Sequence, residues 1–133
     1  MEVRAPLGSE ISAIRDLLAA NGWAHRIPNL AWFQDLLARS TALVGVDEGH
    51  VVGFARAVTD GLSNGYLSMV VVADSHRRRG LGSRLVREII GPEAGMTWAL
   101  RADRPGARQF FESLGFSISE SAMERNRDQR MGT

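Results

Sequence analysis

The chain has 133 residues, of which 44% are hydrophobic, and this suits one domain of ordinary size with its own core. It contains no cysteine, so disulfides, thiolate metal sites and a cysteine nucleophile are excluded. The formal net charge of +1 gives no global positive field for gripping nucleic acid, which argues against a nucleic-acid-binding module.

The first part of the chain predicts one strand and two helices. The first helix has an apolar stripe at helical spacing; Ser9 is a suitable cap for its start, and Asn21-Gly22 is a suitable end. A loop that contains Pro28 leads to the second helix. In order, the predicted elements are a strand over Glu2–Leu7, a helix from Ser9 to about Ala20 and a helix over Leu30–Arg39.

The middle of the chain predicts a hairpin, a further strand and a third helix. Strands over 41–46 and 51–58 flank a polar segment, residues 47–50, which is a hairpin signal. A turn rich in glycine and asparagine follows. We interpret its polar residues, Asp60, Ser63 and Asn64, as turn formers rather than catalysts. The fourth strand is expected over Tyr66–Ala73 and the third helix over about 80–90.

The last third predicts a fifth strand over 96–102, a helix over about 105–114 with Gly115 as its cap, and closing strands over about 116–124. Residues 126–133 are polar and are expected to form a frayed tail. This order indicates a mixed sheet with helices on both faces.

The most informative segment is 66–82, where an apolar strand meets a basic loop that contains glycine and then a helix. Backbone N–H groups converge at a helix start, where the helix dipole also favours negative charge, so this arrangement is suited to a phosphate. Gly80 and Gly82 remove Cβ atoms that would keep a ligand oxygen away. The Walker and dinucleotide glycine patterns are both absent. The segment therefore predicts a pyrophosphate-containing ligand.

Arg77, Gly80 and Gly82 resemble the Arg/Gln-x-x-Gly-x-Gly/Ala loop that binds acetyl-CoA in the GNAT acyltransferase superfamily. Residues 107–116 resemble the second signature of that superfamily, and residues 1–18 resemble its first strand and helix. The resemblance spans nearly the whole chain. It implies a single α/β (α+β) domain over 1–133, with a mixed, mostly antiparallel sheet flanked by helices and with splayed central strands.

The resemblance also implies the reaction: acetyl transfer from acetyl-CoA to a primary amine by direct attack in a ternary complex, without a metal. An amide near 68–70 is expected to polarise the thioester carbonyl. The pantetheine arm is expected to pair with strand backbone, and the phosphates with the loop. The implied cofactor-binding residues are Met69, Val70, Val71, Val72, Arg77, Arg78, Arg79, Gly80, Leu81, Gly82, Ser83, Arg104 and Phe111.

Two positions depart from the superfamily pattern. Phe111 stands where a tyrosine usually protonates the leaving thiolate, and Arg104 stands where an asparagine often precedes the same helix. Phe111 cannot donate a proton. With a thiol pKa of roughly 8.5, expelling an unprotonated thiolate at pH 7 costs only about 2 kcal/mol, so the mechanism is weakened without being excluded.

The catalytic candidates are Tyr66, the only tyrosine, and Ser68, which shares a strand face with it. Tyr66 either holds a water, contacts the acceptor, replaces the missing acid or packs as an aromatic residue at a strand end. His25, near Trp23 and Arg26, either shapes the acceptor pocket or belongs to a surface loop. The remaining aromatic candidates are assigned by packing: Trp32 and Phe33 to the core, and Trp98 either to the splayed gap or to the sheet.

We expect a soluble, intracellular, cytoplasmic protein, because no apolar run reaches membrane-spanning length and no signal peptide is visible. The expected partner is a small-molecule amine, with no nucleic acid and no membrane, and the protein is a monomer or a homodimer. Two alternatives stay open: a non-catalytic acyl-CoA-binding or sensor domain, which Phe111 favours, and an enzyme that modifies a protein amine or an aminoacyl-RNA.

Overall fold

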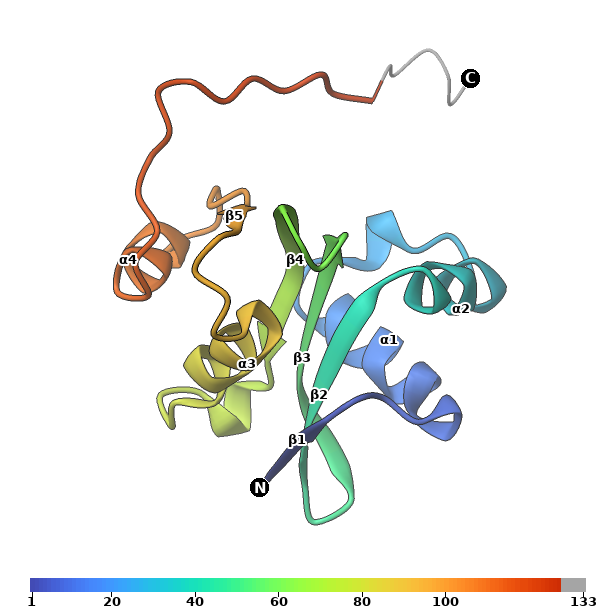
Figure 1. Cartoon of the computed structure of the whole chain (residues 1–133). Coiled ribbons are helices and arrows are strands. Elements are labelled where there is room, and N and C mark those ends of the chain that lie inside the picture. Colours follow the sequence, from blue (N-terminus) through green and yellow to red (C-terminus); the bar gives the residue numbers. More distant parts are fainter. Residues whose placement is uncertain (128–133) are drawn as a thin grey trace. The chain divides into compact units, whose positions relative to one another are not determined.

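The structure, a computed structural model, describes residues 1–127. The chain divides into two compact units, 1–101 and a second that begins at Ala102. The first unit holds a five-stranded sheet and three α-helices (Figure 1). Its strands are β1 (Glu2–Arg4), β2 (Thr41–Asp47), β3 (His50–Thr59), β4 (Asn64–Val72) and β5 (Thr97–Ala99), and its helices are α1 (Ile11–Ala20), α2 (Leu30–Ala38) and α3 (Leu81–Ile90).

The strands follow one another across the sheet in chain order. Those from β1 to β4 pair antiparallel, whereas β5 runs parallel to β4. The predicted hairpin between β2 and β3 is present, and its turn residues Glu48 and Gly49 both have positive φ, as two-residue hairpin turns require. The predicted mixed, mostly antiparallel sheet flanked by helices is confirmed.

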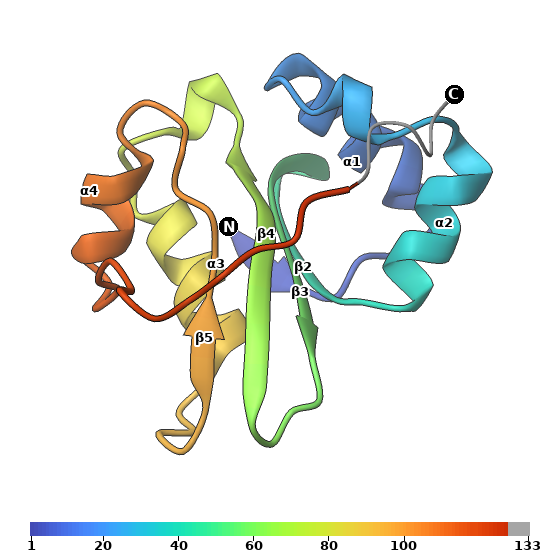
Figure 2. The same ribbon diagram turned by 90° about the horizontal axis from the view of Figure 1, so that it is seen from above.

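Helices cover both faces of the sheet: α1 and α2 lie on one face and α3 on the other (Figures 1 and 2). On the first face, Ile14, Leu18 and Phe33 from the helices pack against Phe54 and other strand residues in one buried cluster. Trp32, which was expected in the core, is 40% exposed, so that prediction is wrong: the residue lies on the solvent side of α2.

On the opposite face, α3 approaches the sheet closely because two glycines lie beneath it. A Cβ at Gly45 or Gly53 would lie within 3 Å of a Leu81 methyl group, and one at Gly53 would also meet Leu85. Leu81 and Leu85 are buried on this face, so the absent side chains of the glycines are what let the helix dock.

A β-bulge interrupts the pairing of β3 with β4. Phe54 lies opposite Val71 and Arg56 opposite Ser68, so β4 contains one more residue than β3 across this interval. Met69 lies in the bulge with φ of 55°. A bulge bends its strand and increases its local twist, and a left-handed conformation at a non-glycine residue costs about 1–3 kcal/mol.

β4 and β5 pair only at their starts. Three residue pairs join them, from Asn64 with Thr97 to Tyr66 with Ala99, while β4 continues to Val72. In the described chain, the rest of this β4 edge pairs with no other strand. The two strands therefore part after Tyr66, as the predicted splay requires. At the paired end, the Trp98 indole lies against Gly65.

Several predicted boundaries are wrong. β1 ends at Arg4 rather than Leu7, since Pro6 has no N–H to continue a ladder. Ser9 does not cap α1: it lies in a 3₁₀ turn, Gly8–Glu10, and the Glu10 carboxylate accepts from the Leu7 N–H (2.8 Å). Glu10 also receives two hydrogen bonds from Arg4, both 2.8 Å long. Similarly, β5 covers only Thr97–Ala99 of the predicted 96–102.

The second unit contains one helix, α4 (Ala107–Glu112), within the predicted 105–114. Gly115 ends it as predicted, with φ of 95°; its N–H donates to the Glu112 carbonyl and the Phe116 N–H to the Phe111 carbonyl. These two bonds form a Schellman motif, and the Phe111 and Phe116 rings, 5.7 Å apart, make its usual apolar contact.

The closing strands predicted over 116–124 are absent from the described chain: this segment has no regular secondary structure. A strand forms only when its backbone finds a partner and its apolar residues a face to cover. Here Met123 is 95% exposed. The predicted frayed tail, 126–133, falls largely outside the described residues. Of residues 1–127, no helix is long and apolar enough to cross a bilayer.

Gly65→Ala should destabilise the first unit. The new Cβ would lie 2.4–2.6 Å from three Trp98 ring atoms, so the indole must move out of its packed position. Overpacking of this kind costs about 1–3 kcal/mol, measured as the free energy of unfolding in denaturant. Gly95→Ala is the matched control, because its Cβ meets only a Glu93 carboxylate oxygen at 3.4 Å. Equal stability of the two variants would contradict the close packing.

Asp60 organises the β3–β4 turn, as predicted. One carboxylate oxygen accepts from the Leu62 and Ser63 N–H groups, both at 2.8 Å, and the other accepts from the Ser63 hydroxyl at 2.5 Å. The Ser63 hydroxyl, followed by the backbone donors, lowers the pKa of Asp60 well below its ordinary value.

Because the folded pKa of Asp60 is depressed, its charge stabilises the fold above the unfolded pKa, and this contribution disappears as the pH falls through the folded value. The melting-temperature difference between wild type and Asp60→Asn should therefore be full at neutral pH and shrink below about pH 3.8. Ser63→Ala should reduce this pH dependence. A difference that does not vary with pH would refute the role of the charge.

Candidate functional site

The loop between β4 and α3, residues 73–80, is fastened to the sheet by Arg77. Its guanidinium donates to the Val72 carbonyl (3.2 Å), to Asp74 (2.9 Å) and to the Asn21 side chain at the end of α1 (2.6 Å). Arg77 was predicted to bind the cofactor. Three of the five guanidinium N–H donors bond inside the protein, so Arg77 fixes the position of the loop, and its contact with the cofactor stays a prediction.

His76 makes a second attachment. One ring nitrogen, Nε2, lies 2.8 Å from an Asp47 carboxylate oxygen at the β2–β3 turn, and Nδ1 lies 2.7 Å from the Ser75 hydroxyl. The hydrogen bond with His76 is the main cause that lowers the pKa of Asp47. This link is not predictable from local sequence, because Asp47 and His76 are far apart in the chain.

The start of α3 is open. Gly80 caps it in a left-handed conformation (φ 81°), and space surrounds the position its Cβ would take. The first helical hydrogen bond runs from the Arg84 N–H to the Gly80 carbonyl (3.0 Å). The amides of Leu81, Gly82 and Ser83 precede that bond and have no intrahelical acceptor.

Two exposed arginines border these amides. Arg78 has a positive φ of 62° and Arg79 follows it directly. In the described chain, neither forms an ion pair within 4.0 Å. The helix start thus combines N–H groups that have no intrahelical acceptor with two exposed guanidinium groups, which is an environment for an anion.

Tyr66 and Ser68 share the sheet face on which α1 and α2 lie. Tyr66 pairs across the sheet with Val58, and Ser68 pairs with Arg56. Arg56 is two residues from Phe54 on β3 and therefore points to the same face, and Phe54 lies in the core beneath α1 and α2. Tyr66 and Val58 are 38% and 48% exposed, so this end of the face opens to solvent. Tyr66 and Ser68 therefore share one sheet face, as predicted, and Ser68 directly precedes the bulge at Met69.

Arg56 is the functional candidate that the sequence analysis missed. It is half-buried on this face, and its Nε donates to the Ser40 hydroxyl (2.8 Å), which donates to the Leu36 carbonyl (2.6 Å). Burial lowers the pKa of the Arg56 guanidinium, and Tyr66 partly opposes this effect. A single charged residue in the apolar run Val51–Val58 was the available signal.

Arg104 and Phe111 lie in the second unit, described here by itself. The Arg104 carbonyl accepts from the Ala107 N–H (3.0 Å) at the start of α4. Phe111 is buried and lies edge-on to Phe110, with ring centres 4.9 Å apart. Both residues therefore have roles in the local structure of α4, and their predicted contacts with the cofactor stay predictions.

The remaining candidates differ in environment. His25 lies in an exposed 3₁₀ turn, Ala24–Arg26, whereas Trp23 beside it packs against the core.

Within residues 1–127, no group of three or more potential ligands is placed to hold a metal ion. Trp98 packs against the sheet at Gly65, and its buried indole N–H has no hydrogen-bond partner in the described chain.

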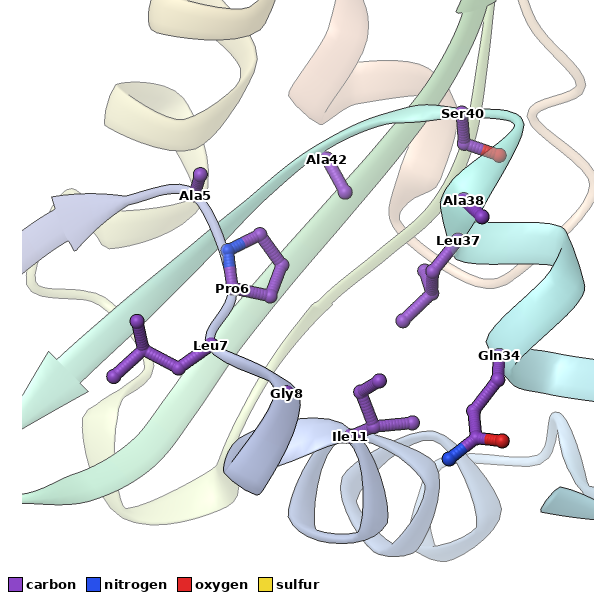
Figure 3. A pocket seen from close by; sticks show the side chains of 10 residues that line it. All are labelled: Ala5, Pro6, Leu7, Gly8, Ile11, Gln34, Leu37, Ala38, Ser40 and Ala42. Atoms are coloured by element: carbon purple, nitrogen blue, oxygen red, sulfur yellow. The ribbon is translucent and has the colours of Figure 1, made fainter. Parts of the chain in front are cut away.

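A pocket of about 370 Å³ lies between the segment after β1 and helix α2 (Figure 3). Pro6, Ile11 and Leu37 give it a mostly apolar lining, and Gln34 and Ser40 add polar atoms. Ser40 is thus shared between this pocket and the anchor of Arg56. None of the phosphate-loop residues lines the pocket.

Comparisons with known proteins agree with this geometry. Residues 11–116 match the Acetyltransferase (GNAT) family. No curated protein matches the sequence significantly. A crystal structure from Xanthomonas campestris pv. campestris, of a protein assigned to the GNAT family, is 29% identical over 95% of this chain and 92% of that one, with a TM-score of 0.79. An acetyltransferase from Trypanosoma brucei is 27% identical, with 95% and 99% covered and a TM-score of 0.74.

A structure from Clostridium acetobutylicum, solved with acetyl-CoA, is 15% identical, covers 94% of this chain and 95% of that one, and has a TM-score of 0.72. At that identity it shows likeness of fold alone. The family match, by contrast, covers most of the chain, including β4, the loop and the start of α3. This chain belongs to the GNAT acetyltransferase family.

Proposed function

We propose that this enzyme transfers an acetyl group from acetyl-CoA to the primary amine of a small molecule within one ternary complex. The observation that carries the proposal is the continuity of β4, its loop and α3: a half-paired strand leads directly into an open helix start. One segment thereby offers a row of backbone groups and a nearby anion site.

The residues at the helix start fit a pyrophosphate. The amides of Leu81, Gly82 and Ser83 have no intrahelical acceptor, and Arg78 and Arg79 are exposed next to them in the chain. Charge-assisted hydrogen bonds from amides and guanidinium groups are the usual means of holding phosphate oxygens. Arg77 positions the loop through its three internal contacts.

The backbone of β4 fits the amide-containing pantetheine arm. Beyond Tyr66, the β4 edge that faces away from β3 pairs with no described strand, so the backbone groups of Met69 to Val71 that point to this edge have no strand partner. The Val72 carbonyl accepts from Arg77 and closes the row. The bulge at Met69 redirects neighbouring amides. We propose that one of these amides donates to the thioester carbonyl as it gains negative charge.

Acetyl-CoA supplies an activated acyl carbon: the amine nitrogen bonds to that carbon, the C–S bond breaks, and the proton given up by the amine balances the released thiolate. Tyr66 and Ser68 are placed to hold the acceptor or a water that removes this proton, since both lie on the open face beside the bulge. Phe111 supplies no acid, so thiolate release relies on water or on Tyr66.

The second candidate function is a non-catalytic acyl-CoA-binding domain, favoured by Phe111 in place of a proton donor. Calorimetric titration with acetyl-CoA, with CoA as the comparison, tests the binding that both candidates share. Release of CoA in the presence of amines then separates them. Binding without release from any amine supports the sensor, and absence of binding at millimolar ligand refutes both.

Gly82→Leu should weaken acetyl-CoA binding at least about tenfold, because a side chain at the helix start displaces the ligand oxygens from the amides. Leucine is a better helix former than glycine, and the melting temperature shows whether the variant keeps its fold. Calorimetry and thermal unfolding give the two readouts, and Gly95→Leu, at an exposed turn, is the control. Unchanged affinity would refute the phosphate-loop assignment.

Tyr66→Phe should lower kcat about tenfold or more while leaving acetyl-CoA affinity unchanged, since only the hydroxyl is removed from the acceptor side. The measurement is the pH profile of CoA release, together with calorimetric titration of the same preparation. Turnover that stays intact across the pH range would show that the hydroxyl has no catalytic part.

A further inference from the structure

The Arg56 guanidinium is positively charged, and no carboxylate in the described chain pairs with it. Its Nε is satisfied by the Ser40 hydroxyl, but no other hydrogen bond or ion pair of this side chain exists in the described residues. The donors on its two terminal nitrogens therefore have no acceptor among residues 1–127. A half-buried guanidinium without a carboxylate is costly, and proteins normally pair such a group.

The anchor of Arg56 shows that its position is held rather than incidental. Ser40 accepts from Nε and donates to the Leu36 carbonyl, so the last turn of α2 fixes the base of the guanidinium. A guanidinium fixed by one edge presents its remaining N–H groups in a planar fork, which matches the two oxygens of a carboxylate.

The location of Arg56 links it to the acceptor. It lies directly opposite Ser68, where opposed Cβ atoms are ~4.5–5.5 Å apart, and Ser68 is followed by the bulge at Met69. Tyr66 is close enough to act on the Arg56 charge. The exposure of Val58 and Tyr66 leaves a solvent path to this part of the face.

We propose that Arg56 is an anion subsite of the acceptor site and that the preferred acceptor is an amine that carries a carboxylate, of the amino-acid class. The inference rests on the acetyltransferase activity proposed above. The carboxylate pairs with the terminal nitrogens of Arg56, which directs the amine toward Ser68, Tyr66 and the bulge.

The test compares L-amino acids with their own carboxamides as acceptors in a CoA-release assay. We expect kcat/KM to favour the acids at least about tenfold, chiefly through KM, because charge-assisted bidentate bonds are lost with the amide. At neutral pH a larger fraction of the α-amine is deprotonated in the carboxamides than in the acids. The intrinsic reactivity of the amine therefore favours the carboxamides and works against the expected preference for acids. Equal or better use of the amides by wild type would overturn the proposal.

Arg56→Gln should abolish the preference for acids, and Arg56→Lys should retain part of it, since a lysine keeps the charge but not the fork. Arg39→Gln is the matched control: it removes an exposed arginine beside Ser40 and should leave the preference unchanged. Acetyl-CoA binding and melting temperature are measured for each variant. An Arg56→Gln protein that folds, binds acetyl-CoA and still prefers acids would refute the subsite.

A binding readout separates this inference from the proposed function. The Arg56 Nε–H resonance is followed by NMR in the CoA-loaded protein as glycine or glycinamide is added. A shift with glycine alone supports the subsite even if no acceptor is acetylated, a result that would count against the enzyme alone. If neither compound causes a shift and the acids are not preferred as acceptors, the subsite is overturned. If other amines are still acetylated in that case, the proposed function stands without the subsite.

Discussion

The unequal pairing of β4 is the constraint on which the other features of the site depend. Along one edge this strand is paired with β3 from Gly65 to Val72, and along the other it meets β5 only at its first residues. A strand held on a single edge keeps its place in the sheet while exposing a row of backbone groups. Natural sheets usually cover or blunt such an edge, and the proposed function gives this one the pantetheine arm as its partner.

The bulge and the glycines make that geometry compatible with a packed domain. Met69 accepts an unfavourable left-handed conformation, and buried neighbours hold it there. Behind the strand, Gly45 and Gly53 let α3 approach the sheet, so the helix start lies close to the end of β4. The strain and the lost side chains are local costs that the packing of both faces offsets.

The three consecutive arginines, Arg77 to Arg79, differ in their contacts. Arg77 is bound by three protein acceptors, and with His76 it ties the loop to α1 and to the β2–β3 turn. Arg78 and Arg79 are exposed and form no ion pair within 4.0 Å in the described chain. The internal contacts of Arg77 order the loop without a ligand, and for the proposed anion site such preorganisation would reduce the entropy lost on binding.

Periodicity and glycine placement predicted the order of the elements, the hairpin and the loop, because these depend on local sequence. Ser9 failed as a cap since Glu10, held by Arg4 from β1, captured the Leu7 amide instead. The closing strands failed for a related reason: residues 116–124 have strand-like composition, but no partner edge accepts them in the described chain. Capping and pairing are decided by tertiary competition, which a single sequence does not display.

In the candidate site, too, the features set by local sequence were predictable and those set by tertiary contacts were not. The glycine-containing loop was found from its spacing, but the bulge at Met69 and the isolation of Arg56 depend on register between strands. Arg56 lies in an apolar run and looks from the sequence like an ordinary charged residue at the surface. Only the fold shows that its face is the one beneath α1 and α2, and that Ser40 at the end of α2 uses just one of its donors. In the proposed site the contacts to the acyl donor come largely from the backbone, which sequence motifs mark well, whereas the contacts to the acceptor come from a few side chains that strand register brings together.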